Sequence, residues 1–228
     1  GAFVASDEGV SLQNDEWPVD AAIPTEMRDV LAEQLRNHPQ YRTLIQCAVC
    51  ASQGREFPVS LVAQALGKPT RDLLVDLDRL DRETSILYDV RQRDDIFAFQ
   101  SSFMLDVVRQ ELQIDRITGA DDAPQIIREH HARLGLILER EANASPQHLY
   151  QMASHFYAAG PRHAERGLRY SLESVKAACA MLDFATAEHY LMIGEVCGKA
   201  TGITDVVEAE RLYVKCLKAH VTGQFEDH

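Results

Sequence analysis

The chain has 228 residues and a formal net charge of −12, and 46% of its residues are hydrophobic and 25% charged. This length is enough for one large domain or two small ones, and the composition is typical of a globular protein. No apolar run reaches the roughly 18 residues that span a bilayer, no secretory signal opens the chain, and no large block of the sequence is net basic, so a membrane anchor and a nucleic-acid-binding surface are both disfavoured.

The first 38 residues predict a β-hairpin followed by a helix. GAFVA and VSLQNDEW flank SDEG, and Gly9 suits the tight turn between two strands. IPTEMRDVLAEQLRN then carries an apolar stripe that includes Leu31 and Leu35, and Pro24 fits an early helical position. We interpret residues 1–38 as the end of an upstream region and a linker, and we expect the chain to be a piece of a larger protein.

Residues 39–101 predict three helices and a β-hairpin, which is the element order of a winged helix. YRTLIQCAVCAS has apolar residues at helical spacing, PVSLVAQALG predicts a short helix capped by Gly67, and TRDLLVDLDRLDRE predicts a third helix with Thr70 as its N-cap. SILYDVRQRDDIFAFQ alternates on both arms, as a hairpin does. We interpret the intervening GREF as a turn that carries Phe57 into the core.

Residues 102–228 predict helices alone. The apolar periodicity of SFMLDVVRQELQI and APQIIREHHARLGLILEREA is followed by four segments of similar length, SPQHLYQMASHFYAAG, RHAERGLRYSLESVKAACAML, FATAEHYLMIGEVCGKATG and TDVVEAERLYVKCLKAHVTG. Alanine recurs where such helices would approach closely. Paired helices with small-residue contacts indicate an α-solenoid of tetratricopeptide-like helix pairs. The fold class that we predict is therefore mainly α, a winged helix followed by an α-solenoid, truncated at its C-terminal end.

Two short motifs suggest chemistry and fail on spacing. Zinc needs four ligands, and the pair Cys47 and Cys50 has neither a second pair nor two spaced histidines, so we interpret it as two small buried residues on a helix. GKPT lacks the first glycine of a phosphate loop, with Val62 in its place, and Lys68 precedes Pro69, which has no N–H. We expect no metal, no cofactor and no ATP-hydrolysing site in this chain. Five cysteines, an odd number in apolar contexts, favour a reducing compartment, and we expect the cytoplasm.

Two further functions stay open as alternatives. The third helix of a winged helix could bind DNA, but in residues 69–82 three arginines face four aspartates, and the wing tip RQRDD is nearly neutral. An enzyme site could be assembled across helices, since the sequence has nine histidines. However, His130 and His131 are adjacent and point to different faces of a helix, and no Ser/His/Asp or H-E-x-x-H pattern occurs.

The order of these pieces resembles a known family. WPVDAAIPTEMRDVLAEQL, CAVCASQGREFPVSLVAQALG, LLVDLDRLDRETSIL and FAFQSSFMLDVVRQEL resemble, in order, the segments that follow the nucleotide-binding core in bacterial signal-transduction ATPases with numerous domains, the maltose-regulator-like predicted ATPases. HHARLGLILE, ASHFYAAG and AERGLRY are similar to the signatures of the helical repeats in that family. The resemblance covers most of the chain and depends on the order of individually weak motifs.

The resemblance implies a non-catalytic regulatory role. It implies that residues 1–38 end the upstream ATPase region, that residues 39–101 form a winged helix that restrains this core, and that residues 102–228 form repeats that bind a protein or small-molecule effector. ATP or ADP would be bound by the parent protein. Ser101 is the candidate nucleotide contact, at the position where the family has a nucleotide-sensing histidine. On the helical repeats we expect partner contacts from His155, Tyr157, Tyr170 and Tyr190.

Overall fold

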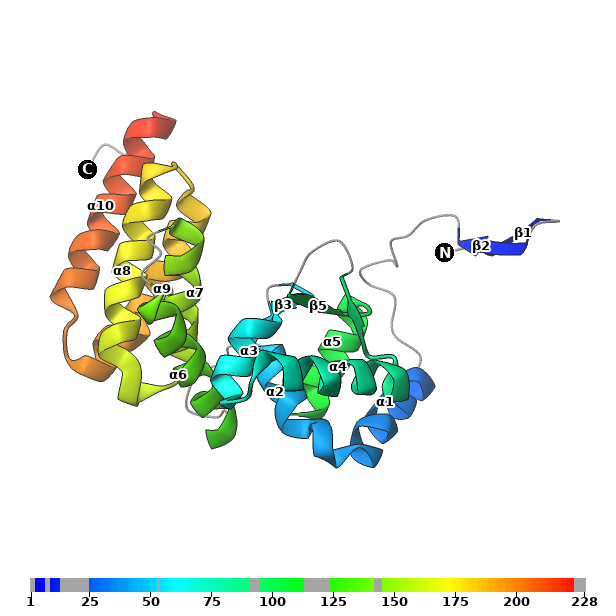
Figure 1. Ribbon diagram of the computed structural model, residues 1–228. Helices are drawn as coiled ribbons and strands as arrows, with labels where there is room; N and C mark the ends of the chain where they lie inside the picture. The colour runs from blue at the N-terminus through cyan, green and yellow to red at the C-terminus, as the bar shows by residue number, and fades with distance from the viewer. Residues whose placement is uncertain are drawn as a thin grey trace.

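The protein is mainly α-helical, as predicted, in the residues that its computed structural model describes, which are 3–6, 9–12, 25–52, 54–90, 95–112, 124–141 and 145–223. This part of the chain contains ten α-helices and two small sheets, arranged as in Figure 1. The elements are β1 Phe3–Ser6, β2 Gly9–Leu12, α1 Thr25–Asn37, η1 Pro39–Tyr41, α2 Arg42–Ala51, β3 Glu56–Pro58, α3 Val59–Leu66, α4 Thr70–Thr84, β4 Leu87–Asp89, β5 Ile96–Phe99, α5 Ser102–Glu111, α6 Gln125–Arg140, α7 Pro146–Ala158, η2 Pro161–His163, α8 Ala164–Ala180, α9 Phe184–Thr201 and α10 Asp205–Thr222.

The predicted N-terminal hairpin is present as β1 and β2, which pair antiparallel with Phe3 opposite Leu12 and Ser6 opposite Gly9. The predicted second strand was longer, but residues 13–24 lie outside the described residues, as does Pro24 at the expected start of the helix. The helix itself is confirmed as α1.

The second sheet has a strand that the sequence did not reveal. β4 and β5 form the predicted hairpin, with Tyr88 opposite Ala98, and β3 adds to the other side of β5, with Phe57 opposite Phe97. The segment that we interpreted as a turn is therefore partly a strand. Three residues are too few for a period-2 pattern, so only the pairing with a distant segment defines β3. The side chain of Phe57 is fully buried, as predicted, and its ring lies 5.9 Å from that of Phe99.

Two helix caps were predicted around GKPT, and the structure confirms the first but not the second. Gly67 ends α3 in the left-handed conformation, with φ +66°, as a C-terminal cap does. Thr70, by contrast, is not an N-cap: Pro69 holds that position, and its carbonyl accepts bonds from the N–H groups of Asp72 and Leu73. The extended backbone of a proline can provide the N-cap carbonyl, so Thr70 enters the first turn of α4.

The helices form two packed groups that α6 joins (Figure 1). α5 packs against α1, α2 and β5, so it lies with the elements before residue 101 although we assigned it to the helical region. α6 packs against α2 and α3 on one side and α7 on the other. The side chain of Arg133 on α6 donates to the carbonyl of Ala65 at the end of α3, at 3.3 Å. Helices α5 and α6, which follow the predicted boundary at residue 101, thus pack against elements that precede it.

From α6 onward each helix packs mainly against the next one in the chain. The most extensive contacts join α7 with α8 and α8 with α9, and α10 contacts both α9 and α8. Small residues line these contacts. Of the four alanines expected there, Ala153, Ala178 and Ala187 are buried, whereas Ala177 is half-buried. A Cβ atom at position 198 would lie 2.6 Å from the carbonyl oxygen of Ile203. Gly198 therefore allows the α9–α10 connection to approach α9 closely.

Candidate functional site

Ser101 has a structural role in the capping of α5. It is the N-cap of this helix, and its hydroxyl accepts a hydrogen bond from the backbone N–H of Met104 at 3.1 Å. Serine is a favoured N-cap because this bond satisfies one of the free N–H groups of the first turn. The capping bond uses an acceptor site of the hydroxyl, which is half-buried, and gives a reason for serine at position 101 that does not require a nucleotide.

The four residues that we expected to contact a partner are buried in the helical stack. His155, Tyr157, Tyr170 and Tyr190 are each less than one-tenth exposed. The hydroxyl of Tyr170 donates to Glu139 at 2.9 Å, and that of Tyr190 donates to the carbonyl of Tyr150 at 3.2 Å. Burial, followed by the bond to Glu139, raises the pKa of Tyr170 to about 12. A partner docking on the outside of the stack would meet other side chains first.

A histidine pair links α6 to α7. His131 Nδ1 and His155 Nδ1 lie 2.9 Å apart, with ring centroids 5.2 Å apart, so one nitrogen donates and the other accepts. Burial lowers the pKa of His155 to about 4, and burial together with the neighbouring His155 and His130 lowers the pKa of His131 well below its usual value. Both rings are neutral at pH 7. His130, which the helical pattern left unassigned to a face, is the most buried histidine, and neither of its ring nitrogens has a partner among the described residues.

Cys47 and Cys50 lie on the buried face of α2 as reduced residues. Burial raises the pKa of the Cys47 thiol to about 12 and also raises that of Cys50, so neither is a thiolate at neutral pH. Within the described ranges, no group of three or more His, Cys, Asp and Glu side chains is arranged to hold a metal ion. The geometry of α2 therefore supports the interpretation of these cysteines as packing residues.

The exposed side of α4 carries both charges and apolar side chains. Leu73, Leu77 and Leu80 are buried, whereas Leu74 and Val75 are exposed between the charged residues. Lys68, just before α4, pairs with Asp76 at 3.0 Å, which reduces the positive charge available at this end. Residues 91–94 of the predicted wing tip lie outside the described residues.

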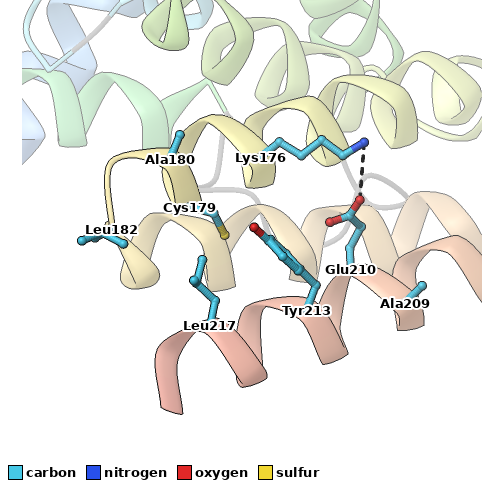
Figure 2. A pocket seen from close by; sticks show the side chains of 8 residues that line it. All are labelled: Lys176, Cys179, Ala180, Leu182, Ala209, Glu210, Tyr213 and Leu217. Atoms are coloured by element: carbon cyan, nitrogen blue, oxygen red, sulfur yellow. Dashed lines mark ion pairs between the residues drawn. The ribbon is translucent and has the colours of Figure 1, made fainter. Parts of the chain in front are cut away.

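A surface groove lies between α8 and α10 and has a volume of about 600 Å³. Its lining residues are Lys176, Cys179, Ala180, Leu182, Ala209, Glu210, Tyr213 and Leu217. Figure 2 shows the ring of Tyr213 pointing from α10 toward α8, with an ion pair between Lys176 and Glu210 at one end, 3.4 Å long. Leu182, which is half exposed, lies at the other end, on left-handed backbone with φ +57° that a leucine rarely adopts.

The sequence does not reveal this groove, because its two walls are about 30 residues apart in the chain. One signal was present: Tyr213 and Leu217 recur at helical spacing beside Val207 and Val214, the residues that bury α10 against its neighbours. A helix with apolar residues beyond one stripe has a second apolar face. The groove can therefore bind an apolar group, which would lie beside the ion pair of Lys176 and Glu210.

Comparisons with protein-family models, with characterised proteins and with solved structures return no match to this chain. None of the helices that the structure describes has the length and apolar character of a bilayer-crossing segment.

Proposed function

We propose that this chain is a non-catalytic regulatory region of a multidomain signal-transduction ATPase, in which a winged helix restrains the ATPase core and an α-solenoid of tetratricopeptide-like helix pairs binds a partner or effector. The observation that carries the proposal is the element order. Three helices, α2 to α4, precede the β4–β5 hairpin, and a run of antiparallel helices follows in which each packs on its neighbours. That order agrees with the resemblance of the sequence motifs.

The position of α6 supports a role in communication between the two parts. It packs against α2 and α3 and also against α7, and it carries Arg133, which bonds to the end of α3. A rigid helix shared by two packed groups transmits a displacement of one to the other, because closely packed interfaces shift as units. An effector that changed the packing of α7 on α6 would therefore also shift α6 against α2 and α3 in the proposed winged helix.

DNA binding is the second candidate, and the charge of α4 disfavours it. A recognition helix needs basic side chains for phosphate as well as polar groups for base edges. The exposed side of α4 includes as many acidic as basic groups, and Lys68 is already paired. A mobility-shift assay with random duplex at increasing salt should detect no tight, salt-sensitive complex.

The proposal is tested by nucleotide binding and by addition of the ATPase core. Isothermal titration of the purified chain with ATP and ADP should detect no binding at micromolar concentrations, and the chain should not hydrolyse ATP. Added to a separately purified core of such an ATPase, it should lower the rate of hydrolysis. Micromolar nucleotide binding or intrinsic hydrolysis by this chain would contradict the proposal, and a core whose rate is unchanged would contradict the restraining role.

A further inference from the structure

The outward face of α10 is an apolar seam without a partner among the described residues. α10 buries Val207 and Val214 against its neighbours, and it lies at the edge of the helical stack in Figure 1. Leu212 and Cys216, on the opposite side, are exposed, and so is Ala209, which also borders the groove beside α8. Their alternating spacing of three and four residues is that of a coiled-coil seam, which is normally covered by another helix.

The two flanks of this seam differ in chemistry. One flank presents Val206 and Tyr213, which are about half exposed, and Tyr213 also lines the groove between α8 and α10. The other presents Glu208 in the first half of the helix and Lys215 in the second half. Glu208 lies 3.6 Å from Arg211 in an exposed pair, a geometry that contributes little. Lys215 has no ion-pair partner in the described part of the chain, so both groups are available to another helix.

We propose that α10 is a self-association surface, on which a second copy of this chain docks its own α10 in antiparallel orientation. A two-fold axis perpendicular to the pair of helices brings like flanks together. With Ala209 opposite the partner's Leu212, a small residue faces a large one in both symmetric layers. In the same register Glu208 faces the partner's Lys215 on one flank, and Val206 faces the partner's Tyr213 on the other. A parallel pair would instead place the charged flank of each helix beside the Val206 and Tyr213 flank of the other, so neither Glu208 nor Lys215 would meet a group of opposite charge.

This self-complementarity is the reason to favour a second copy over an unrelated helix. Glu208 and Lys215 have opposite charges and lie on the same flank, one in each half of the helix. An antiparallel homodimer therefore forms the Glu208–Lys215 contact twice, once at each end of the pair. The face is one helix of 18 residues, about 27 Å long, and is smaller than the roughly 800 Å² per partner of a standard interface. The association is therefore weak and depends on concentration. The dimer proposal rests on the proposed function in one respect, which is that the helical region is an interaction module.

The test is the mass of the full chain by sedimentation equilibrium over a concentration series. The wild type should show a monomer–dimer equilibrium, and Leu212→Asp should shift it at least tenfold toward monomer. Val75→Asp is the matched control, because Val75 on α4 is exposed to the same degree, 54% against 55% for Leu212. Circular dichroism should report the same helix content for all three. A monomer at every soluble concentration, or an equal effect of the two substitutions, would overturn the proposal.

Charge reversal tests the orientation. Glu208→Lys and Lys215→Glu should each weaken the dimer, and the double variant should restore it. Asp205→Cys tests the register: under mild oxidation it should form a disulfide with the partner's Cys216, whereas wild-type chains should not cross-link through two copies of Cys216. A failure to rescue, or cross-linking of the wild type, would overturn the antiparallel arrangement. None of these outcomes bears on nucleotide binding or on restraint of an ATPase core, so the two proposals can fail separately.

Discussion

The two packed groups of helices differ in which segments of the chain build their buried interior. In the first group, large side chains from distant segments meet: Phe57 on β3, Leu77 on α4 and Phe99 on β5 are all fully buried. In the second group, helices that are consecutive in the chain approach closely through small residues such as Ala178 and Gly198. The first group therefore depends on large side chains that fill a core shared by distant segments. The second group also buries large side chains, such as Phe156, but it needs small residues where its backbones meet.

This difference predicts which substitutions each group tolerates. A core built from long-range contacts loses stability when a large side chain is removed, because the cavity is only partly filled by relaxation. A stack with close backbone approach loses stability when a side chain is added. The stack also buries imidazoles, which the first group does not, so acid should affect it more.

The largest expected effect is that of Phe57→Ala. Removing a fully buried ring that contacts Phe99 should reduce the free energy of unfolding by about 3–5 kcal/mol, measured by urea denaturation. Val75→Ala, at an exposed position of α4, is the control and should change it by less than about 0.5 kcal/mol. Similar losses for both would mean that the three-stranded sheet does not close the core as described.

Acid should destabilise the stack through its buried histidines. The pKa of His155 is lowered to about 4 by burial, so the unfolded chain takes up the proton first. The stabilisation is fully present above about pH 6.5 and is lost as the pH falls from there toward 4, and it amounts to about 3 kcal/mol at most.

The double variant His131→Leu/His155→Leu is the reference for this pH effect. Unfolding free energies measured by denaturant between pH 7 and pH 4.5 should fall more steeply for the wild type than for the variant, because the variant lacks the pair. Parallel curves would show that the pair of His131 and His155 has no share in the acid sensitivity.

Two glycines of α9 provide a matched test of close approach. Gly198→Ala would place Cβ 2.6 Å from the carbonyl oxygen of Ile203, a backbone atom, and should cost about 1–3 kcal/mol. Gly194→Ala would meet Ser171 at an ordinary 3.6 Å and should stabilise α9 by up to about 1 kcal/mol, because alanine favours helices. Thermal denaturation distinguishes the two. Equal shifts in Tm would contradict the described approach of the α9–α10 connection.

The smallest effect concerns the cysteines. Cys47→Ala should cost about 1 kcal/mol, as expected for a small cavity, and should alter no binding property. In the native wild type, a thiol reagent should label Cys216 quickly, because it is exposed, and should label the buried cysteines only on unfolding. Rapid labelling of Cys47 would mean that α2 opens readily, which would contradict a tightly filled core in the first group.

Local patterns in the sequence were enough to predict the helices and the hairpins. The apolar periodicity of α2, α4, α5 and α6, the similar lengths of the segments that form α7 to α10, the glycine that ends α3 and the alternation in β4 and β5 are local properties of the sequence. Backbone geometry converts such local patterns into elements. Two short motifs, the cysteine pair and GKPT, were likewise separated from metal and phosphate sites by spacing alone.

Tertiary structure alone decided what each face of those elements meets. β3 is a strand because it pairs with β5, α5 belongs with the first group because it packs on α1, and the aromatic residues that we expected at a partner surface are buried because α6 to α9 close over them. Tertiary packing likewise forms the groove between α8 and α10 and leaves the seam of α10 uncovered. A helical pattern specifies which residues share a face, but only the packed neighbours determine whether that face is covered, because burial is a property of two surfaces and not of one.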